Sequence, residues 1–487
     1  MIPGYAITEY PNTREIYAKM SRLLQLAPYK IKKDKMPQYL KYFEQKCARS
    51  KNLIQKAKKY IPGGVQHNLA FNYPFPLVIT KAEGPYLYDI DGNQYIDFLQ
   101  AGGPTLLGSN YAPVREKVIE VINECGPVTG LFHEYELKLA KEINKHMPAV
   151  EMFRMLGSGT ESDMAVVRIA RLATKKKKII KLGGAYHGWS DQFVYGIHLP
   201  GTGRFEAHGI PSSYSKHTQE VFPNDIHALE RQLRLNKLNG GTAAVILEPV
   251  GPESGTRPID FEYNKQAREL CDKYDALLIF DEVVTAFRLG MGGAQGYFKV
   301  KPDLTVFGKI VAGGYPGAGG VGGRRDLISY LAAGVESGKK RAYVGGTLSA
   351  NPLSTAAGYY AIKEIERTDA AVKAGRAGDS LTKGLQKLIE KYELPFVAYN
   401  QGSICHLETV GTMFLKLNYL KIFKILKEIK KRKSAMEEFG AAYMAEGMVT
   451  LAGSRLYTSM ADTPEILKDA LSRFDRVFQN VYCDNSS

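Results

Sequence analysis

An alternation of short apolar runs and helical segments between residues 115 and 330 restricts the possible folds more than any other feature of the chain. The apolar runs are rich in β-branched and aromatic residues, as in TAAVILEPV, ALLIFDEV and DLTVFGK. Segments between them, such as DFEYNKQARELCDKYD, place apolar residues at helical spacing. Because strands that alternate with helices form a parallel sheet covered by helices, we expect an α/β fold with a mainly parallel sheet.

The two ends of the chain predict a smaller domain. The 487 residues exceed the size of one ordinary compact domain. Residues 1–50 predict a helical extension, and residues 51–114 predict short strands with a hairpin turn at DIDGN, which form the N-terminal part of a small α+β domain. We assign residues 115–370 to a large domain and residues 371–487 to the C-terminal part of the small domain.

Composition excludes several classes of protein. Apolar residues make up 44% of the chain, but no run is long enough to span a membrane. The N-terminus lacks the pattern of a secretory signal, and five scattered cysteines predict reduced thiols in the cytoplasm. No Cys/His pair has the spacing of a zinc site, so we expect no metal. The net charge of +15 suits anionic ligands, but the lysine-rich stretches lack interleaved aromatic residues, so we do not expect nucleic acid binding.

Polar residues follow the predicted strands at Glu248, Asp281 and Lys309. Ligands of open parallel sheets bind beyond the carboxyl ends of the strands, so we expect these residues on one rim. Asp281 suits a metal ligand, a general base, the partner of a heteroaromatic cation or a helix N-cap. A desolvated Lys309 would lose proton affinity and form a Schiff base with an aldehyde, whereas a lysine on the surface would do neither.

Two further motifs precede or follow strand-like runs. In MLGSGTESDMAVVRIARLA, Ser158, Gly159 and Thr160 lead into a helical segment, whose N-terminus either binds an anion or carries an ordinary N-cap. In GGAYHGWSD, Tyr186 and His187 follow an apolar run. An aromatic residue at that place either stacks on a planar ring or packs at the strand end.

Together these motifs meet the needs of one cofactor, pyridoxal phosphate. Its phosphate requires a helix N-terminus, its aldehyde requires an amine, and its pyridine nitrogen requires an anion, because the protonated ring withdraws electrons from a carbanion. We expect Asp281 to hold that proton. We expect Lys309 to tether the cofactor and to move protons at the substrate Cα.

The motif set is similar to that of a known family. GSGTES, AYHGWSD, ILEPV, IFDEVVTAFR, FGKIVAGGYPGAGGVGG and GGTLSANPL occur in the order seen in class III, fold-type I aminotransferases that use pyridoxal phosphate. Over residues 50–480 the chain resembles above all glutamate-1-semialdehyde 2,1-aminomutase and its relatives. The resemblance implies a large domain built on a mainly parallel sheet, a small α+β domain, and a homodimer with shared active sites.

The resemblance also implies roles for individual residues. Lys309 would carry the cofactor, Asp281 would pair with the pyridine nitrogen, and Tyr186 would be catalytic and stack on the ring. Thr347, in GGTLSANPL, would reach the phosphate of the neighbouring subunit's cofactor. The full set of implied cofactor-binding residues is Ser158, Gly159, Thr160, Tyr186, His187, Asp281, Val283, Lys309 and Thr347.

Two departures from the aminomutase pattern concern the substrate. Glu253 stands where aminomutases usually have Asn and many ω-aminotransferases have Glu. Arg455 falls at, or one residue from, a position that is Glu in aminomutases and aligns with an arginine that binds the substrate α-carboxylate in many aminotransferases. Glu253 is a candidate for the partner that holds Arg455 aside. An arginine that aminomutases carry after PGGV is absent, and His67 or Asn68 either lines the entrance there or caps a turn.

We therefore predict an aminotransferase that moves an amino group between an amino acid, or an amino-carbonyl compound, and an oxo acid through a Schiff base on Lys309. Three alternatives remain open: an aminomutase, a class III amino-acid racemase, and a non-catalytic protein that keeps the fold. The sequence leaves open the amino donor and its stereochemistry. For residues 1–50 it leaves open a helix over the dimer interface and a cover of the active-site entrance.

Overall fold

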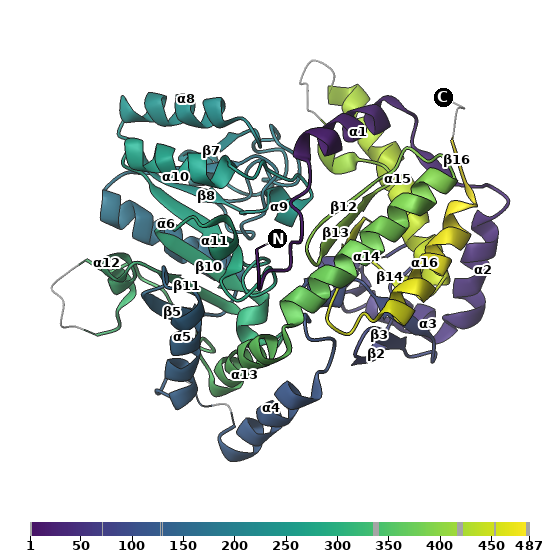
Figure 1. The fold of residues 1–487 in the computed structure, drawn as a ribbon, viewed down its shortest axis with the longest axis horizontal. Coiled ribbons are helices and arrows are strands. Elements are labelled where there is room, and N and C mark those ends of the chain that lie inside the picture. Colours follow the sequence, from purple (N-terminus) through teal and green to yellow (C-terminus); the bar gives the residue numbers. More distant parts are fainter. Residues whose placement is uncertain are drawn as a thin grey trace. The chain divides into compact units, whose positions relative to one another are not determined.

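A seven-stranded sheet forms the centre of the larger of two units into which the chain divides (Figure 1). The computed structural model describes residues 2–70, 72–126, 128, 130–334, 340–415, 422–451 and 454–483. The large unit consists of Met1–Tyr5 and Ala112–Val372, and the small unit consists of Ala6–Tyr111 and Lys373–Ser487.

The sheet of the large unit has the strand order β5-β11-β10-β9-β8-β6-β7. Neighbouring strands are parallel except where β11 pairs with β10 and β5. The strands are β5 (Met152–Leu156), β6 (Lys178–Leu182), β7 (Thr218–Val221), β8 (Thr242–Leu247), β9 (Leu277–Asp281), β10 (Leu304–Gly308) and β11 (Gly319–Gly323). The prediction of a mainly parallel sheet covered by helices is confirmed.

Both faces of the central strands are buried, which explains their continuous apolar runs. In β9, Ile279 packs into one hydrophobic cluster with residues of α6 (Gly159–Thr174), such as Val166 and Ile169. The residues on either side of it in β9, Leu278 and Phe280, point to the opposite face and are also fully buried. A strand of this kind cannot show an alternation of apolar and polar residues.

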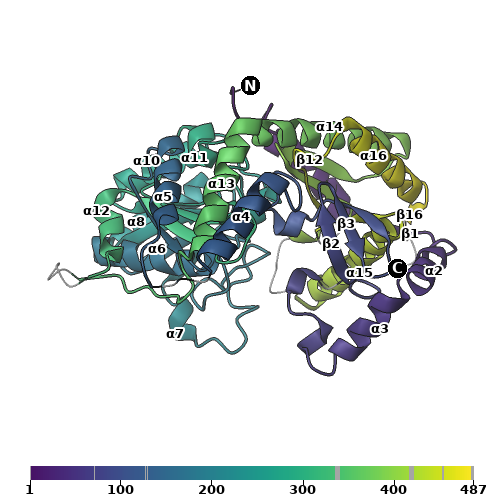
Figure 2. The same cartoon turned by 90° about the horizontal axis from the view of Figure 1, so that it is seen from below.

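Helices surround this sheet in the large unit, as Figures 1 and 2 show. They are α4 (Ala112–Glu124), α5 (Glu134–His146), α6 (Gly159–Thr174), α7 (Ser212–Ser215), α8 (Ile226–Lys237), α9 (Pro252–Gly255), α10 (Tyr263–Lys273), α11 (Gly293–Phe298), α12 (Arg325–Ile328) and α13 (Pro352–Thr368). Several begin at side-chain caps: Asp225 accepts from Ala228 N at α8, and Asn351 accepts from Ser354 N at α13.

The small unit combines three sheets with six helices among the residues described. The sheets have the orders β12-β13-β15, β14-β4-β3-β2 and β1-β16. The strands are β1 (Tyr29–Ile31), β2 (Ile79–Glu83), β3 (Tyr86–Asp89), β4 (Gln94–Asp97), β12 (Val397–Gln401), β13 (Ile404–Glu408), β14 (Met448–Val449), β15 (Arg455–Tyr457) and β16 (Val481–Cys483). The helices are α1 (Thr13–Gln25), α2 (Met36–Lys46), α3 (Ala48–Ala57), α14 (Ala370–Lys391), α15 (Ile422–Ala445) and α16 (Pro464–Phe478).

An N-terminal strand and the last described strand pair inside the small unit. Strand β1 pairs antiparallel with β16, with Tyr29 opposite Cys483 (Figure 2). Helix α1 buries Ile16 and Met20 against Val397 of β12. The segment 1–50 therefore contributes α1, β1, α2 and the start of α3 to the small unit, apart from its first five residues. Among the helices that the structure describes, none has both the length and the apolar composition to cross a membrane.

The packing of α13 on the turn at Lys309 gives a first prediction. A Cβ at Gly358 of α13 would overlap the carbonyl oxygen of Val311, in the 3₁₀ turn Lys309–Ala312. Gly358→Ala should therefore lower the free energy of unfolding by about 1–3 kcal/mol, because the helix and the turn must separate. Urea unfolding of the full chain measures this change.

Gly440→Ala in α15 is the matched control. A Cβ at Gly440 has open space around it, so the better helix propensity of Ala should leave stability unchanged or raise it by up to about 1 kcal/mol. Equal stabilities of Gly358→Ala and the wild type would show that α13 does not press on this turn.

Candidate active site

Three polar residues of the predicted rim lie at the carboxyl ends of neighbouring parallel strands. Strand β9 ends at Asp281, Glu248 follows β8, and Lys309 follows β10. In the pairing of β10 with β9, Val306 stands opposite Asp281, which leaves Lys309 three residues beyond that position. The pairing of β8 with β9 places Leu247 opposite Phe280. The structure thus brings Glu248, Asp281 and Lys309 to one edge of the sheet, as the strand ends predict.

Asp281 is a buried carboxylate with a defined set of hydrogen bonds. Its side chain is almost fully buried, its Oδ2 lies 2.7 Å from Nδ1 of His187, and its Oδ1 accepts from the Val283 N–H at 3.1 Å. The residues after it form turns and no helix, so the helix N-cap alternative does not apply. Burial lowers the pKa of His187, against the raising effect of Asp281. A neutral imidazole donates from Nδ1, because a carboxylate only accepts.

Val283 fills a gap between two glycines. A Cβ at Gly308 would lie 2.8 Å from Cγ1 of Val283, and a Cβ at Gly159 would lie 3.0 Å from Cγ2. The valine therefore contacts both the first residue of α6 and the residue before Lys309. Larger residues at either glycine would push the strand end and the helix end apart. The packing of Val283 on a cofactor ring stays a prediction.

Lys309 occupies a strained backbone position. It begins the 3₁₀ turn Lys309–Ala312 with a φ of 51°, in the left-handed region that residues other than glycine seldom adopt. Its side chain is half-buried. Strain of this kind persists where surrounding packing fixes the backbone, and α13 supplies such packing here. The neighbour of Asp281, Glu282, is fully buried and accepts from Ala294 N, Gln295 N and Thr285 Oγ1, which makes it a structural support.

The N-terminus of α6 opens into a pocket. Ser158 is the N-cap of this helix and accepts from the Glu161 N–H at 3.2 Å. The cap does not decide between the two alternatives for this motif, because an anion site uses the same helix end. A pocket of about 1200 Å³ is lined in part by Ser158, Thr160 and Thr347. The structure thus brings the hydroxyls of one chain together at the end of α6. Phosphate binding there, and the reach of Thr347 to a neighbouring subunit, stay predictions.

Glu248 is a site residue whose role the sequence did not reveal. Its carboxylate accepts from the backbone N–H groups of Tyr186 and Glu253, each at 2.8 Å, and from both N–H and Oγ of Ser254. Glu253 and Ser254 have φ values of 46° and 48°, so these hydrogen bonds hold a strained turn in place. Burial, followed by the charge of Asp281, raises the pKa of Glu248 to about 7. One carboxylate therefore positions both Tyr186 and Glu253.

Tyr186 and Glu253 share a second neighbour, His198. Its ring stacks on that of Tyr186 with centroids 6.4 Å apart, and its Nδ1 lies 3.2 Å from Oε1 of Glu253. Arg455, the expected partner of Glu253, begins β15 in the small unit, opposite His406 of β13. The pairing of Arg455 with Glu253 stays a prediction.

His67 caps a turn. Its Nδ1 accepts from the Leu69 N–H at 3.0 Å, as one of the two alternatives for this position predicts. The turn belongs to the small unit and precedes the short 3₁₀ helix Asn68–Ala70. We therefore assign His67 a structural role.

Comparisons with known proteins agree on one family. The model of the family "Aminotransferase class-III" matches residues 69–429. The chain belongs to the class III aminotransferases. It is 41% identical over 363 residues to a glutamate-1-semialdehyde 2,1-aminomutase from Legionella pneumophila (strain Corby). The aligned region covers 73% of this chain and 82% of that protein.

Solved structures of relatives share the fold of this class III aminotransferase. A glutamate-1-semialdehyde aminomutase from Pseudomonas aeruginosa PAO1 matches with a TM-score of 0.79 and 21% identity, over 95% of this chain and 98% of that chain. An omega-transaminase from Sphaerobacter thermophilus matches with a TM-score of 0.76 and 24% identity, over 88% and 97% of the two chains. The predictions of the family and of a fold-type I architecture are confirmed.

The cofactor of this class III aminotransferase is pyridoxal phosphate, as predicted. The residues present fit it. Lys309 places an amine beside a strand end, and Asp281 places a buried anion on the neighbouring strand. The pocket at the N-terminus of α6 offers backbone N–H groups and hydroxyls to an anion.

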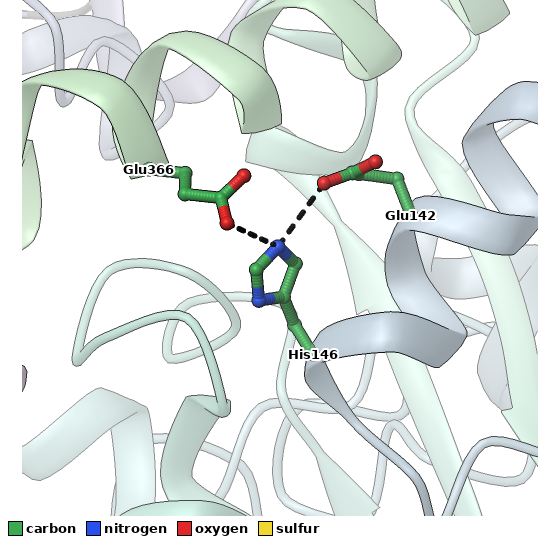
Figure 3. A group of neighbouring side chains, drawn as sticks. All are labelled: Glu142, His146 and Glu366. Carbon is green, nitrogen blue, oxygen red and sulfur yellow. Dashed lines mark hydrogen bonds and ion pairs between the residues drawn. The ribbon is translucent and has the colours of Figure 1, made fainter.

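A second group of carboxylates and an imidazole lies between α5 and α13 (Figure 3). Nε2 of His146 is 3.1 Å from Oε1 of Glu142 and 3.6 Å from Oε1 of Glu366. This spacing suits metal ligands, but Lys145 lies 2.7 Å from Glu366 and Lys363 lies 3.6 Å from the same carboxylate. Because the two lysines neutralise the two glutamates, we interpret the group as an ion-pair network that joins the helices.

The contact between His198 and Glu253 gives a pH-dependent prediction. The hydrogen bond to Glu253 raises the pKa of His198 above its ordinary value of 6.5, against the effect of burial. The contribution of this contact to the stability of the folded state is therefore full below pH 6.5, and it is lost as the pH rises through the pKa of His198 in the folded state. His198→Asn should lower the free energy of unfolding more at about pH 5.5 than at about pH 8.5.

The expected difference is less than about 1 kcal/mol, because the side chain of His198 is 39% exposed. Urea unfolding at both pH values measures it, and His208→Asn, at an exposed histidine ten residues further along, is the control. If His198→Asn lowers the free energy of unfolding equally at both pH values, or more at the higher pH, a protonated His198 bound to Glu253 is ruled out.

Proposed function

We propose that the protein is an aminotransferase that moves an amino group between an amino acid, or an amino-carbonyl compound, and an oxo acid. The observation that carries this proposal is the shared rim of β9 and β10, where a buried acid, Asp281, ends one strand and a half-buried lysine, Lys309, follows the other. Membership of class III supports amino transfer as the type of reaction.

The chain's own residues would divide the work as follows. Pyridoxal phosphate supplies an aldehyde that reacts with amines and a ring that withdraws electrons when its nitrogen is protonated. Asp281 holds the proton at that nitrogen, and His187 orients the carboxylate through the bond of 2.7 Å. The Lys309 amine binds the cofactor and then moves the proton of the substrate Cα.

Other residues would bind and orient. Glu248 fixes the backbone of Tyr186, whose ring is partly exposed and available to stack on the cofactor. Val283 would close the opposite face, since its methyl groups already lie against Gly308 and Gly159. The N-terminus of α6 would bind the phosphate through Ser158, Gly159 and Thr160. Thr347 of a second subunit would complete the phosphate site.

Arg455 and Glu253 are our candidates for substrate selection. A guanidinium binds a carboxylate in a bidentate manner, and a nearby carboxylate releases or retains it according to the substrate present. Within the large unit, Oε1 of Glu253 contacts His198. A glutamate at this position favours an aminotransferase over an aminomutase, in which Asn is usual.

An aminomutase is the second candidate. The identity of 41% to the Legionella protein, over most of both chains, favours it. The core of the site would serve both reactions, because each needs the same lysine and the same acid. The reactions differ in whether the oxo product leaves before the amino group returns. The racemase and the non-catalytic protein have no comparable observation in their favour.

We also propose that a second copy of the chain covers part of the large unit. Leu131, Phe132, Tyr343 and Leu348 are each at least 63% exposed. Leu131 and Phe132 line a pocket of about 770 Å³ together with Thr347. Apolar side chains gathered in this way mark an interface. Sedimentation velocity should give the mass of a dimer, and a monomer at micromolar concentration would contradict this proposal.

A single-turnover experiment tests the proposed function. Protein loaded with pyridoxal phosphate is mixed with one amino acid at a time, without an oxo acid. We expect one donor class to convert the bound cofactor stoichiometrically to its amino form and to release one equivalent of oxo product. Absorbance follows the cofactor, and chromatography quantifies the product.

Other outcomes separate the alternatives. Exchange of the Cα proton in deuterated water without release of product would contradict an aminotransferase and indicate a mutase or a racemase. A chiral separation of the amino acid then distinguishes the two, since only a racemase gives the opposite enantiomer. A protein that stays colourless after incubation with pyridoxal phosphate would contradict all three enzymes.

A further inference from the structure

A buried acid on α6, Asp163, has no role in the site as described so far. It lies in the second turn of α6 and is 1% exposed. Its Oδ1 has no hydrogen-bond partner among the described residues. Buried polar atoms without a partner are rare in folded proteins, because they lose the hydrogen bonds that water would provide. The carboxyl group of Asp163 therefore needs an explanation.

Its neighbours are Asp281, which faces the cofactor ring nitrogen in the proposed function, and His187, which orients Asp281. One polar atom from each of Asp163, His187 and Asp281 lies within 4.8 Å of the others. Nδ1 of His187 is bonded to Asp281, whereas its buried Nε2 has no partner among the described residues. Two unpartnered polar atoms, Nε2 of His187 and Oδ1 of Asp163, thus belong to one cluster of three side chains.

Lys181 is the cation whose charge acts on Asp163, and several other groups share it. Glu248 accepts four hydrogen bonds and lies near the fully buried Lys181, whose Nζ donates to the carbonyl groups of Ala185 and Tyr195. Asp281 faces the protonated ring nitrogen of the cofactor in the proposed function. A third carboxylate in this interior would be an uncompensated charge.

This environment favours the protonated, neutral form of Asp163. Burial raises its pKa well above the ordinary value, and the charges of Asp281 and Glu248 raise it further, against the opposing effect of Lys181. A protonated carboxyl group is a hydrogen-bond donor. Nε2 of His187 is an acceptor, because the proton of the neutral ring is on Nδ1.

We propose that Asp163 is a positioning residue that donates a hydrogen bond, through one bridging water, to Nε2 of His187. This bond fixes the tautomer of His187 whose Nδ1–H holds Asp281 toward the cofactor ring nitrogen. The three residues form a relay from α6 through the loop after β6 to the end of β9. The proposal rests on the role of Asp281 in the proposed function, and it assigns a purpose to both unpartnered atoms.

A pair of substitutions separates a neutral donor from a charged group. Asp163→Asn keeps a donor of nearly the same shape, whereas Asp163→Leu keeps the approximate volume without a donor. The full-length proteins are stripped of cofactor and reconstituted with pyridoxal phosphate. Two quantities are measured: the dissociation constant of the cofactor, and the pH midpoint at which the visible absorbance of the bound cofactor changes.

We expect Asp163→Asn to keep both quantities close to those of the wild type. Asp163→Leu should weaken cofactor binding about tenfold and shift the pH midpoint, because His187 loses the bond that fixes its tautomer. Asp163→Ala gives the same readings if the leucine variant does not fold. Equal values for wild type and Asp163→Leu would overturn the proposal, and so would an Asn variant that behaves as the Leu variant does.

Two controls make these outcomes specific. Asp303→Asn changes another buried acid, which lies at the amino end of β10, whereas Lys309 follows the carboxyl end. Asp303 accepts hydrogen bonds from Arg268 and Arg324. This variant should lose stability without a shift of the cofactor's pH midpoint. Asp281→Asn should weaken cofactor binding in the same assay. If Asp281→Asn binds the cofactor as tightly as the wild type does, the proposed function fails. If Asp281→Asn weakens cofactor binding but Asp163→Leu does not, only the role of Asp163 is refuted.

Discussion

The hydrogen bond between Asp281 and His187 is the interaction on which the rest of the site depends. It joins two fully buried groups, one at the end of β9 and one in the loop after β6, at 2.7 Å. A buried carboxylate needs hydrogen-bond donors in place of water. The imidazole donates to one oxygen of Asp281, and the Val283 N–H donates to the other. Strand, loop and turn are therefore fixed together.

The sheet makes this arrangement possible. Parallel neighbours bring Glu248, Asp281 and Lys309 to one edge, and glycines at positions 159 and 308 let helix and strand ends approach Val283 closely. Glu248, at the end of β8, fixes the backbone of Tyr186 and the turn at Glu253 through hydrogen bonds. Backbone N–H donors thus hold the Glu248 carboxylate, together with the Ser254 hydroxyl.

The parts of the structure that depend on local patterns were predictable from the sequence. The apolar runs of β8, β9 and β10 predicted strands, and their carboxyl ends predicted the rim, because both follow from side-chain period and parallel topology. The cofactor followed from the residue types on that rim. The N-cap at Ser158 remained one of two alternatives, since an anion site and an ordinary cap use the same residues.

Features that depend on distant residues were not predictable in the same way. Asp163 is an unremarkable helical residue in the sequence, and its place beside Asp281 follows only from the packing of α6 on the sheet. The hydrogen-bond donors to Glu248 include Tyr186, which lies 62 residues earlier in the chain, and Ser254, which lies six residues later. The pairing of β1 with β16 joins the two ends of the chain, and no local pattern indicates that partner.

The most direct test of the account is to locate the bound cofactor on the chain. Borohydride reduction of the protein loaded with pyridoxal phosphate makes the bond to the lysine permanent, and mass spectrometry of the digested protein identifies the modified peptide. The account predicts a stoichiometric modification of Lys309 in the wild type and none at that position in Lys309→Ala. A modification on another lysine, or an unmodified Lys309 peptide, would contradict it.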